Sequence, residues 1–401
     1  MRRLLGTVGV ITLIGAGLSS APAYAAAPTC QGRTATIVAT ADAEDLQGSE
    51  DADVIVVGAF NQVHVNGRGG DDVICATAGH QAVLDGGPGD DTLEDQQVDH
   101  QVRDDLETVL LGGDTGDDRL IGGPATQISY ETSEVGVTID LAAGTVVHAG
   151  GTDTVVGIHQ VTGSDQADIF RGSPGDDRYI GEIGNPGGDQ VAAGAGNDYV
   201  QAAQATVDLG PGDDTGAVFG GTISGGEGDD SLGVSQSGTA LGGPGRDRLD
   251  AYLDDDYPYE FGPVRLDGGP GNDTLVMPFA RAEHRAGGCP GLCARGTLDG
   301  GSGSDVLELG EARRAVVDLG AGEARVYSGR SSIAAIENVT GSRHADVIRG
   351  DRHANRLEGN DGDDVLVGRS GADRLIGGSG RDRASGGPGR DRCTAELRSS
   401  C

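Results

Sequence analysis

The sequence repeats a short run of glycines and acids in which one carboxylate keeps a fixed position. In GGPGDDTLE, residues 86–94, glycines fill the first, second and fourth positions, Asp91 is sixth and Leu93 is eighth. Glycine accepts positive φ and leaves backbone carbonyl oxygens exposed in a turn. Carbonyl and carboxylate oxygens together are the ligands that a hard cation such as Ca²⁺ prefers. These residues therefore favour cation binding.

The regular spacing predicts a folded repeat rather than a linker. With 3% aromatic residues, no Trp and a net charge of −34, composition alone would predict disorder. From Gly341 to Gly386, however, a glycine opens six consecutive nine-residue units. Their sixth residues are Asp346, Asn355, Asp364, Asp373, Asp382 and Asp391. Their eighth residues are Ile348, Leu357, Leu366, Leu375, Ala384 and Cys393, and a flexible linker would not keep this phase.

These units resemble the nonapeptide G-G-x-G-x-D-x-U-x of the RTX, or hemolysin-type, calcium-binding proteins. Good copies lie at 86–94, 225–233, 242–250, 268–276 and 300–308, and weaker ones at 48–56, 67–75, 113–121, 163–180, 193–201 and 209–217. The resemblance implies an all-β fold, a right-handed parallel β-roll or β-solenoid. Six residues of each unit would form a turn and three a short strand, with two units to a coil and the eighth side chain inside.

The resemblance also implies that the sixth-position carboxylates bind Ca²⁺ as the cofactor, between turns of units i and i+2. Asp364 would then pair with Asp382, and Asp373 with Asp391, whereas Asn355 would weaken its site. The predicted metal ligands are Asp53, Asp72, Asp91, Asp118, Asp168, Asp177, Asp189, Asp198, Asp214, Asp230, Asp247, Asp273, Asp305, Asp346, Asp364, Asp373, Asp382 and Asp391. His344 and His353 stand where a fourth-position glycine is expected, and we interpret them as exposed turn residues rather than a histidine metal site.

Ligand spacing differs between blocks. Asp53, Asp72 and Asp91 are 19 residues apart, whereas the acids from Asp198 to Asp247 are 16, 16 and 17 apart. One good turn per coil predicts calcium along one edge only in these blocks.

A longer repeat divides the chain. Residues 136–172 align without gaps to 314–350 with 14 of 37 positions identical, and their alternating apolar residues predict strands that continue the solenoid. The predicted organisation is a signal peptide (1–25), an N-terminal cap segment (26–47), a first repeat block (48–129), a strand-rich spacer (130–162), a second block (163–250), interrupted repeats with aromatic and cysteine-containing insertions (251–313), a second spacer (314–340), a C-terminal tandem array (341–394) and a C-terminal cap (395–401).

The N-terminus and the cysteines indicate export. Arg2 and Arg3, an apolar run from 4 to 18 and the small-residue site at 23–25 are typical of a cleaved secretory signal, so we expect a secreted, extracellular protein without a membrane span. Six cysteines then favour disulfides. Their grouping suggests the pairs Cys30 with Cys75, Cys289 with Cys293, and Cys393 with Cys401; a zinc site from Cys289, Cys293 and His284 is the alternative.

Acidity argues against nucleic acid as a partner, because phosphates would be repelled. H-E-x-x-H and G-x-S-x-G are absent, and adjacent acids such as Asp90 and Asp91 suit ligation better than catalysis, so no enzyme is predicted. The sequence favours a structural or surface protein that binds calcium, with cell-surface or extracellular polysaccharide as a further partner. The alternative is a polysaccharide-acting enzyme or carbohydrate-binding protein on a β-solenoid, for which the Tyr-rich segment 251–263 could supply a stacking surface rather than a packed loop.

Overall fold

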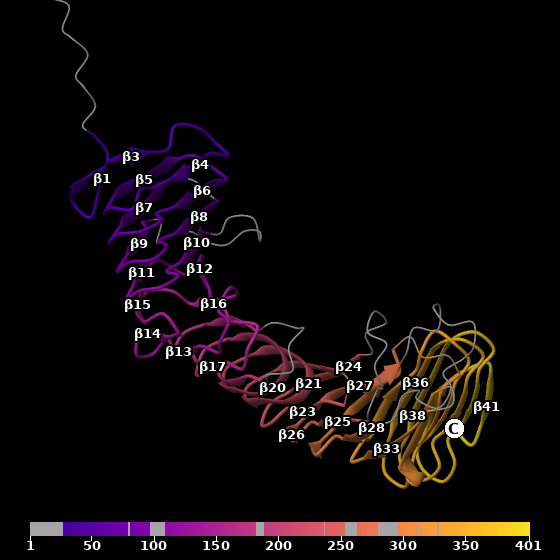
Figure 1. The fold of residues 1–401 in the computed structure, drawn as a ribbon. Coiled ribbons are helices and arrows are strands. Elements are labelled where there is room, and N and C mark those ends of the chain that lie inside the picture. Colours follow the sequence, from indigo (N-terminus) through magenta and orange to yellow (C-terminus); the bar gives the residue numbers. More distant parts are fainter. Residues whose placement is uncertain are drawn as a thin grey trace, which may run out of the picture.

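The chain winds into a long, bent coil of short parallel strands (Figure 1). The computed structural model describes residues 27–78, 81–96, 109–181, 188–235, 237–252, 263–279, 296–310, 312, 314–326 and 329–401. Within these residues there are β-strands, one 3-10 turn (η2, Leu319–Ala321) and no α-helix. The predicted all-β parallel β-roll is confirmed. The signal segment, Cys289, Cys293, His284 and most of 251–263 lie outside the described residues.

Most strands pair with the strand two places further along the chain, so the coil has two faces. Face 1 contains, in spatial order, β3 (Ile37–Val38), β5 (Val54–Ala59), β7 (Val73–Ala78), β9 (Thr92–Asp95), β11 (Arg119–Ile121), β15 (Thr152–Val156), β14 (Thr145–Val147), β13 (Thr138–Asp140), β17 (Ile169–Arg171), β19 (Gln190–Ala192), the second halves of β20 (Tyr199–Pro211) and β21 (Thr215–Glu227), β23 (Thr239–Leu241), β25 (Val264–Asp267), β28 (Gly296–Asp299), β33 (Gly329–Ala334), β32 (Glu323–Val326), β31 (Val316–Asp318), β35 (Val347–Arg349), β37 (Val365–Val367), β39 (Arg383–Ser385) and β41 (Leu397–Ser399).

Face 2 contains β4 (Asp45–Gln47), β6 (Val63–Asn66), β8 (Ala82–Asp85), β10 (Val109–Gly112), β12 (Thr126–Ser129), β16 (Gln160–Thr162), β18 (Arg178–Ile180), the first halves of β20 and β21, β22 (Ser231–Ser235), β24 (Arg248–Tyr252), β27 (Thr274–Phe279), β30 (Val306–Glu308), β34 (Asn338–Thr340), β36 (Arg356–Asp361), β38 (Arg374–Ser379) and β40 (Arg392–Thr394). Outside the two faces, β1 (Thr29–Cys30) and β2 (Arg33–Thr34) form an antiparallel hairpin, and β26 (Pro270–Gly271) pairs with β29 (Ser302–Gly303) in a turn.

The core is a continuous column of small and medium apolar side chains between the two faces. Side chains alternate along each strand, and the eighth residues of the repeats point inward, as predicted. Leu357 of β36 lies opposite Leu375 of β38 in the parallel register, and both are fully buried. One apolar residue per strand is enough here because each coil stacks on its neighbours.

Each strand-rich spacer inserts a three-stranded antiparallel meander into face 1. In the first spacer, β15 pairs with β14 and β14 with β13, while β15 and β13 continue the parallel pairing to β11 and β17. In the second spacer, β33, β32 and β31 do the same between β28 and β35. The spacers therefore continue the solenoid, each through an antiparallel meander in face 1.

The first meander lies where the solenoid bends. Between β11 and β17, face 1 contains three strands, β15, β14 and β13. Between β12 and β18, face 2 contains only β16. Two additional strands at the usual spacing make face 1 longer by about 10 Å. In Figure 1 these three strands lie on the outer side of the bend and β16 on its inner side. We call this region, residues 126–192, the elbow.

Disulfides fasten both ends of the coil. Cys30 of the β1–β2 hairpin is bonded to Cys75 of β7, and both are fully buried against Val56 and Val73 on the outside of face 1. Cys393 of β40 is bonded to Cys401 near the C-terminus. These two predicted pairs are confirmed. The N-terminal hairpin thus covers apolar surface on the first coils, as a terminal cap of a repeat protein must.

Candidate metal centres

The repeat turns stack along the two long sides of the roll. Turns that lead from face 2 to face 1 form one side, which we call edge A; turns that lead from face 1 to face 2 form the other, edge B. Glycines at the second and fourth positions adopt positive φ, for example 84° at Gly87 and 153° at Gly89. Only glycine adopts such a conformation readily, so the pattern of the sequence dictates the shape of the turn.

The sixth-position carboxylates of the first block form a ladder along edge A. The backbone N–H of each Asp donates to Oδ1 of the Asp one coil further on: Asp53 to Asp72 at 2.7 Å, Asp72 to Asp91 at 2.7 Å and Asp91 to Asp118 at 2.8 Å. Each of these carboxylates therefore points toward the turn of the preceding coil, and Asp72, Asp91 and Asp118 are buried.

In the second block and the interrupted repeats the ladder runs along edge B. Its backbone-to-carboxylate bonds measure between 2.7 and 3.0 Å and join Asp177, Asp198, Asp214, Asp230, Asp247, Asp273 and Asp305. The opposite connections in the 16-residue coils are tight turns such as the one at Gly220 and Gly221, which hold no carboxylate. From Asp198 to Asp247 the geometry agrees with one acidic edge, edge B, whereas the start of the second block also joins Asp168 to Asp189 on edge A.

The C-terminal array has carboxylate ladders on both edges. Asp364 donates its N–H to Asp382 Oδ1 on edge A, and Asp373 donates to Asp391 Oδ1 on edge B, each at 2.9 Å. The structure thus places the predicted i and i+2 partners one coil apart on the same edge.

Thirteen of these carboxylates keep one buried oxygen that receives no hydrogen bond from the described chain. A buried oxygen with negative charge and no donor is costly unless a cation compensates it. These oxygens are Oδ2 of Asp72, Asp91, Asp118, Asp198, Asp214, Asp230, Asp247, Asp273, Asp305, Asp364, Asp373, Asp382 and Asp391.

The glycine at the first position of each unit leaves room beside that oxygen. A Cβ atom on Gly359 would overlap both Asp364 Oδ2 and the carbonyl oxygen of Gly377, which belongs to the next coil; a Cβ on Gly368 would overlap Asp373 Oδ2. A carboxylate oxygen and a backbone carbonyl oxygen therefore face the same space. This donor set fits calcium, which takes several oxygen ligands.

Without a cation, burial shifts several of these carboxylates toward their protonated form. Burial, reinforced by neighbouring Asp charges, raises the pKa of Asp91 to about 7 and that of Asp118 to about 8 in the first block. It raises the pKa of Asp247 to about 7 in the second block and that of Asp364 to about 6 in the array. A bound divalent cation would favour the ionised form instead.

Five predicted ligands have both carboxylate oxygens satisfied by protein donors. In four of them a second-position serine supplies the donor: the N–H of Ser49, Ser164, Ser173 or Ser342 binds Oδ2 of Asp53, Asp168, Asp177 or Asp346, respectively. The fifth, Asp189, accepts the hydroxyl of Tyr179 on Oδ2 at 3.2 Å. These five lie at or near the start of a block and offer no unsatisfied oxygen to a metal.

Three carboxylates outside the nonapeptide pattern take the sixth-position role. Asp153 accepts the N–H of Asp118, Glu337 that of Asp305, and Glu396 that of Asp382. The nonapeptide pattern does not identify these three residues, because they lie in spacers or in the terminal cap. Their separation from the preceding ladder residue, 35, 32 and 14 residues, departs from the repeat length.

The remaining residues of the array also have clear positions. Asn355 donates its Nδ2 to the carbonyl of Glu337, so an amide group stands where other turns present a free oxygen. His344 is in an edge A turn and His353 in an edge B turn, and both are exposed. They cannot share one metal ion.

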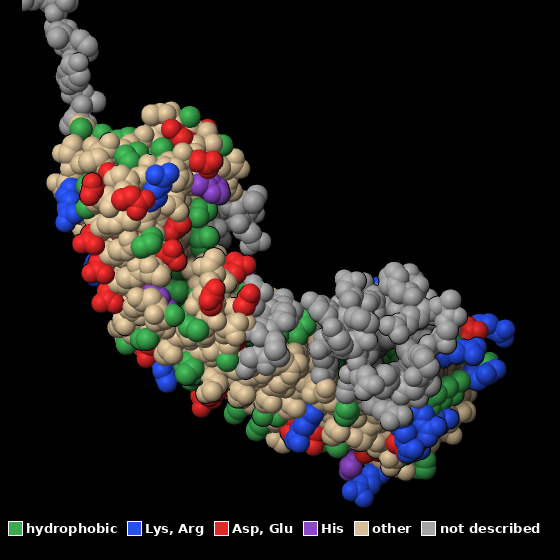
Figure 2. Space-filling view, viewed as in Figure 1, with side chains coloured by type: hydrophobic (Ala, Val, Ile, Leu, Met, Phe, Trp, Pro, Cys, Tyr) green, Lys and Arg blue, Asp and Glu red, His purple; other side chains and the backbone are tan. Residues whose placement is uncertain are grey.

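Fifth-position acids lie on the outside of the turns. Asp71 Oδ1 accepts the N–H of Asp90 and Asp90 Oδ1 that of Asp117, at 3.2 and 3.0 Å, and all three side chains are exposed. Figure 2 shows acidic side chains following one another along the outer side of the N-terminal arm.

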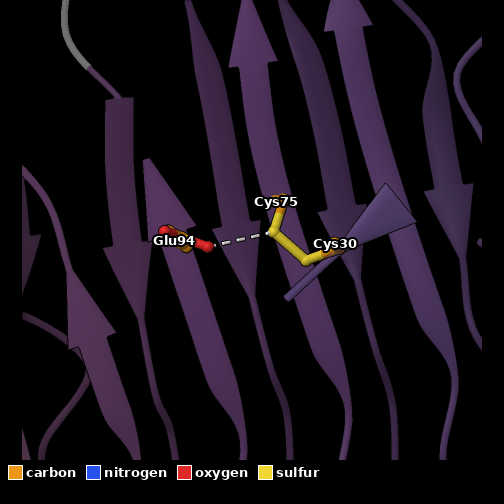
Figure 3. Close-up of side chains that lie close together, drawn as sticks. All are labelled: Cys30, Cys75 and Glu94. Carbon is orange, nitrogen blue, oxygen red and sulfur yellow. Dashed lines mark hydrogen bonds between the residues drawn. A yellow bond between two sulfur atoms is a disulfide. The ribbon is translucent and has the colours of Figure 1, made fainter. Parts of the chain in front are cut away.

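Two other places bring polar or sulfur-containing side chains together. Glu94 approaches the Cys30–Cys75 disulfide, with Oε2 3.4 Å from Cys75 Sγ (Figure 3), but the sulfurs are bonded to each other and Glu94 already accepts from Gln31 Nε2 at 2.9 Å. A shallow groove of about 630 Å³ lies over face 2 of the first block, with Asp45, Glu131 and glutamine side chains in its wall. It is remote in sequence from the aromatic segment 251–263.

A comparison with protein families agrees with this geometry. A family model, the RTX calcium-binding nonapeptide repeat (4 copies), matches residues 160–186, 183–204, 262–276, 340–375 and 367–396. None of the curated proteins matches the chain. The first block lies outside the matched residues but carries the same turns and the same ladder. In the described residues no helix is long and apolar enough to cross a bilayer. The chain therefore contains RTX calcium-binding nonapeptide repeats, and Ca²⁺ is the cofactor that these repeats bind.

Proposed function

We propose that this chain is a secreted, non-enzymatic structural protein of a cell surface or extracellular matrix, and that calcium between its stacked turns is required for its fold. The observation that carries the proposal is the set of thirteen buried Asp Oδ2 atoms without a donor, arranged in columns along the edges. Within the part of the chain that the structure describes, no donor reaches these oxygens.

The chain's own residues explain why calcium would be needed for folding. Each ladder Asp uses Oδ1 to hold the neighbouring coil and would use Oδ2 to bind the ion, together with carbonyl oxygens such as that of Gly377. Calcium supplies the positive charge that lets adjacent carboxylates stay ionised at close range. Because the unfolded chain has no such sites, binding free energy becomes folding free energy.

Export supports an extracellular role. The N-terminal signal pattern, two disulfides and a calcium requirement all suit oxidising surroundings with millimolar calcium. The polar groove over face 2 favours an extended polysaccharide as a further partner, because its wall offers amide and carboxylate groups along parallel strands.

Calcium titration of the mature chain, followed by circular dichroism and metal analysis, tests the proposal. We expect β structure to form as calcium rises through roughly 0.1 to 1 mM, where extracellular modules bind. A spectrum that is the same in chelator and in calcium, with no bound metal, would refute it.

A further inference from the structure

A tyrosine hydroxyl lies between two successive carboxylates of the edge A ladder. We call such a pair of successive ladder residues a joint. The hydroxyl of Tyr179 lies between two ladder carboxylates, 3.1 Å from Asp168 Oδ2 and 3.2 Å from Asp189 Oδ2. Tyr179 is fully buried, and burial raises the pKa of its phenol, so the hydroxyl keeps its proton and donates. A Cβ on Gly163 would overlap both Asp168 Oδ2 and this hydroxyl, which shows that the hydroxyl fills the space next to the first-position glycine.

The second meander provides the matched comparison. In the gapless alignment of the two spacers Asp168 corresponds to Asp346 and Ser164 to Ser342, and continuing the same offset brings Tyr179 to Leu357. There the space beside the first-position glycine, Gly341, faces the carbonyl oxygen of Gly359 instead of a hydroxyl. The next carboxylate on that edge, Asp364, keeps Oδ2 without a donor, whereas Asp189 does not.

A second tyrosine hydroxyl in the elbow also donates to a ladder carboxylate. Tyr130, buried at the end of β12, donates its hydroxyl to Asp153 Oδ2 at 2.7 Å, and His148 Nε2 lies 3.1 Å from Asp153 Oδ1. Asp153 Oδ1 also accepts the backbone N–H of Asp118 and so continues the ladder. Hydroxyl donors thus occur on both sides of the first meander.

We propose that Tyr179, supported by Tyr130, takes the place of calcium in the elbow, so that this joint is held by hydrogen bonds, whereas at the equivalent joint after the second meander Asp364 offers its free Oδ2 to the metal. Calcium removal would then loosen the coils on either side and leave the elbow folded. The inference rests on the proposed calcium requirement of the other turns, and it withdraws Asp168 and Asp189 from the set of calcium ligands.

Hydrogen exchange of the wild-type protein gives the first test. Peptides within 163–192 should remain protected in chelator, while peptides over 341–391 should exchange rapidly there and become protected in calcium. Equal exchange of both regions in chelator would overturn the proposal. If neither region responds to calcium and no calcium binds, the proposed function fails instead, whatever the elbow does.

A reciprocal exchange of residues gives the second test, with bound calcium per chain measured by equilibrium dialysis and metal analysis. Tyr179→Leu installs the residue of the second copy and should add one calcium, with 163–192 now protected only in calcium. Leu357→Tyr should remove one. Phe170→Leu is the control, because Phe170 stacks on Tyr179 at 4.7 Å between ring centroids but has no hydroxyl, and its calcium count should not change. A Tyr179→Leu protein with the wild-type count would contradict the proposal.

Discussion

The first block and the C-terminal array use the same turn but place it differently. In the first block successive ladder acids are 19 or 27 residues apart and lie on edge A alone, whereas the array alternates them every nine residues and places them on both edges. A coil of two full nonapeptides therefore has charged turns on both sides, and a coil with one has a hydrogen-bonded turn on the other side. The number of buried carboxylate oxygens without a donor is therefore set coil by coil.

Calcium withdrawal should separate the two regions most strongly. Because residues 359–394 of the array offer free carboxylate oxygens at both edges, the structure of the array should be lost over a narrower range of free calcium than that of the first block. Hydrogen exchange of the full chain at graded calcium concentrations measures both at once. If the two regions lose protection along one shared curve, the distinction between them is wrong.

Acid should partly replace calcium, and at a different pH in each region. A carboxylate whose pKa is raised on folding stabilises the metal-free fold at low pH, and this stability is lost as the pH rises through the folded pKa. That pKa is about 6 for Asp364, and about 7 and 8 for Asp91 and Asp118, through burial.

In calcium-free buffer, raising the pH from 5 should therefore destabilise the array mainly up to about pH 6 and the first block up to about pH 8. Hydroxyl-radical footprinting at each pH follows both regions without depending on amide exchange rates. Saturating calcium should abolish the difference over this range, and an array that went on opening above pH 7 while the first block did not would contradict the assignment.

The disulfides should stabilise the two ends unequally. Cys30–Cys75 spans 45 residues and Cys393–Cys401 spans 8. Loop entropy gives about 4 kcal/mol for the first and about 2.5 kcal/mol for the second. Paired Cys→Ser variants, compared by chemical unfolding in saturating calcium, should reproduce this order, and a larger loss at the C-terminal pair would rule out loop closure as the main effect.

Two adjacent acids of the array test directed ligation against bulk charge. Asp364 Oδ2 is buried without a donor, whereas Asp363 is exposed and uses Oδ1 to accept the N–H of Arg381 at 3.0 Å. Asp364→Asn should weaken calcium binding by about 1.5 to 3 kcal/mol, because an amide would replace a charged ligand. Asp363→Asn removes the same charge and should cost less than half as much.

Calcium titration of the full-length variants decides between them. Asn355 already shows the expected arrangement of an amide at this position, with its Nδ2 directed to a backbone carbonyl. Equal losses for both substitutions would mean that net charge, and not the register of the turn, holds the ion.

The repeat predicts the fold because each position of the nonapeptide has a separate structural role. Asp364 at the sixth position and Leu366 at the eighth occupy the edge and the core as expected, since glycines fix the turn between them. The meanders were harder to predict, because alternation such as that from Val137 to Leu141 fits an antiparallel strand as well as a parallel one. The change of acidic edge also depends on how the spacer passes the chain between faces.

The limits of the site prediction have equally specific causes. Serine at the second position is visible in the sequence, but only the structure shows Ser164 and Ser342 donating to their own sixth residues. The ring of Tyr179 fills the apolar eighth position of its unit while its hydroxyl reaches edge A. The repeat pattern therefore does not distinguish Tyr179 from an ordinary core residue. Glu337 and Glu396 are ligand-type residues that the repeat length could not locate.

A crystal structure of the mature chain grown in calcium, with anomalous scattering to locate the ions, tests the central claim most directly. The account predicts ions beside Oδ2 of Asp72 and Asp91 on edge A, beside Asp214 and Asp230 on edge B, and on both edges of the array. Between Asp168 and Asp189 it predicts none. Calcium bound elsewhere, with these carboxylate oxygens still lacking a partner, would contradict it.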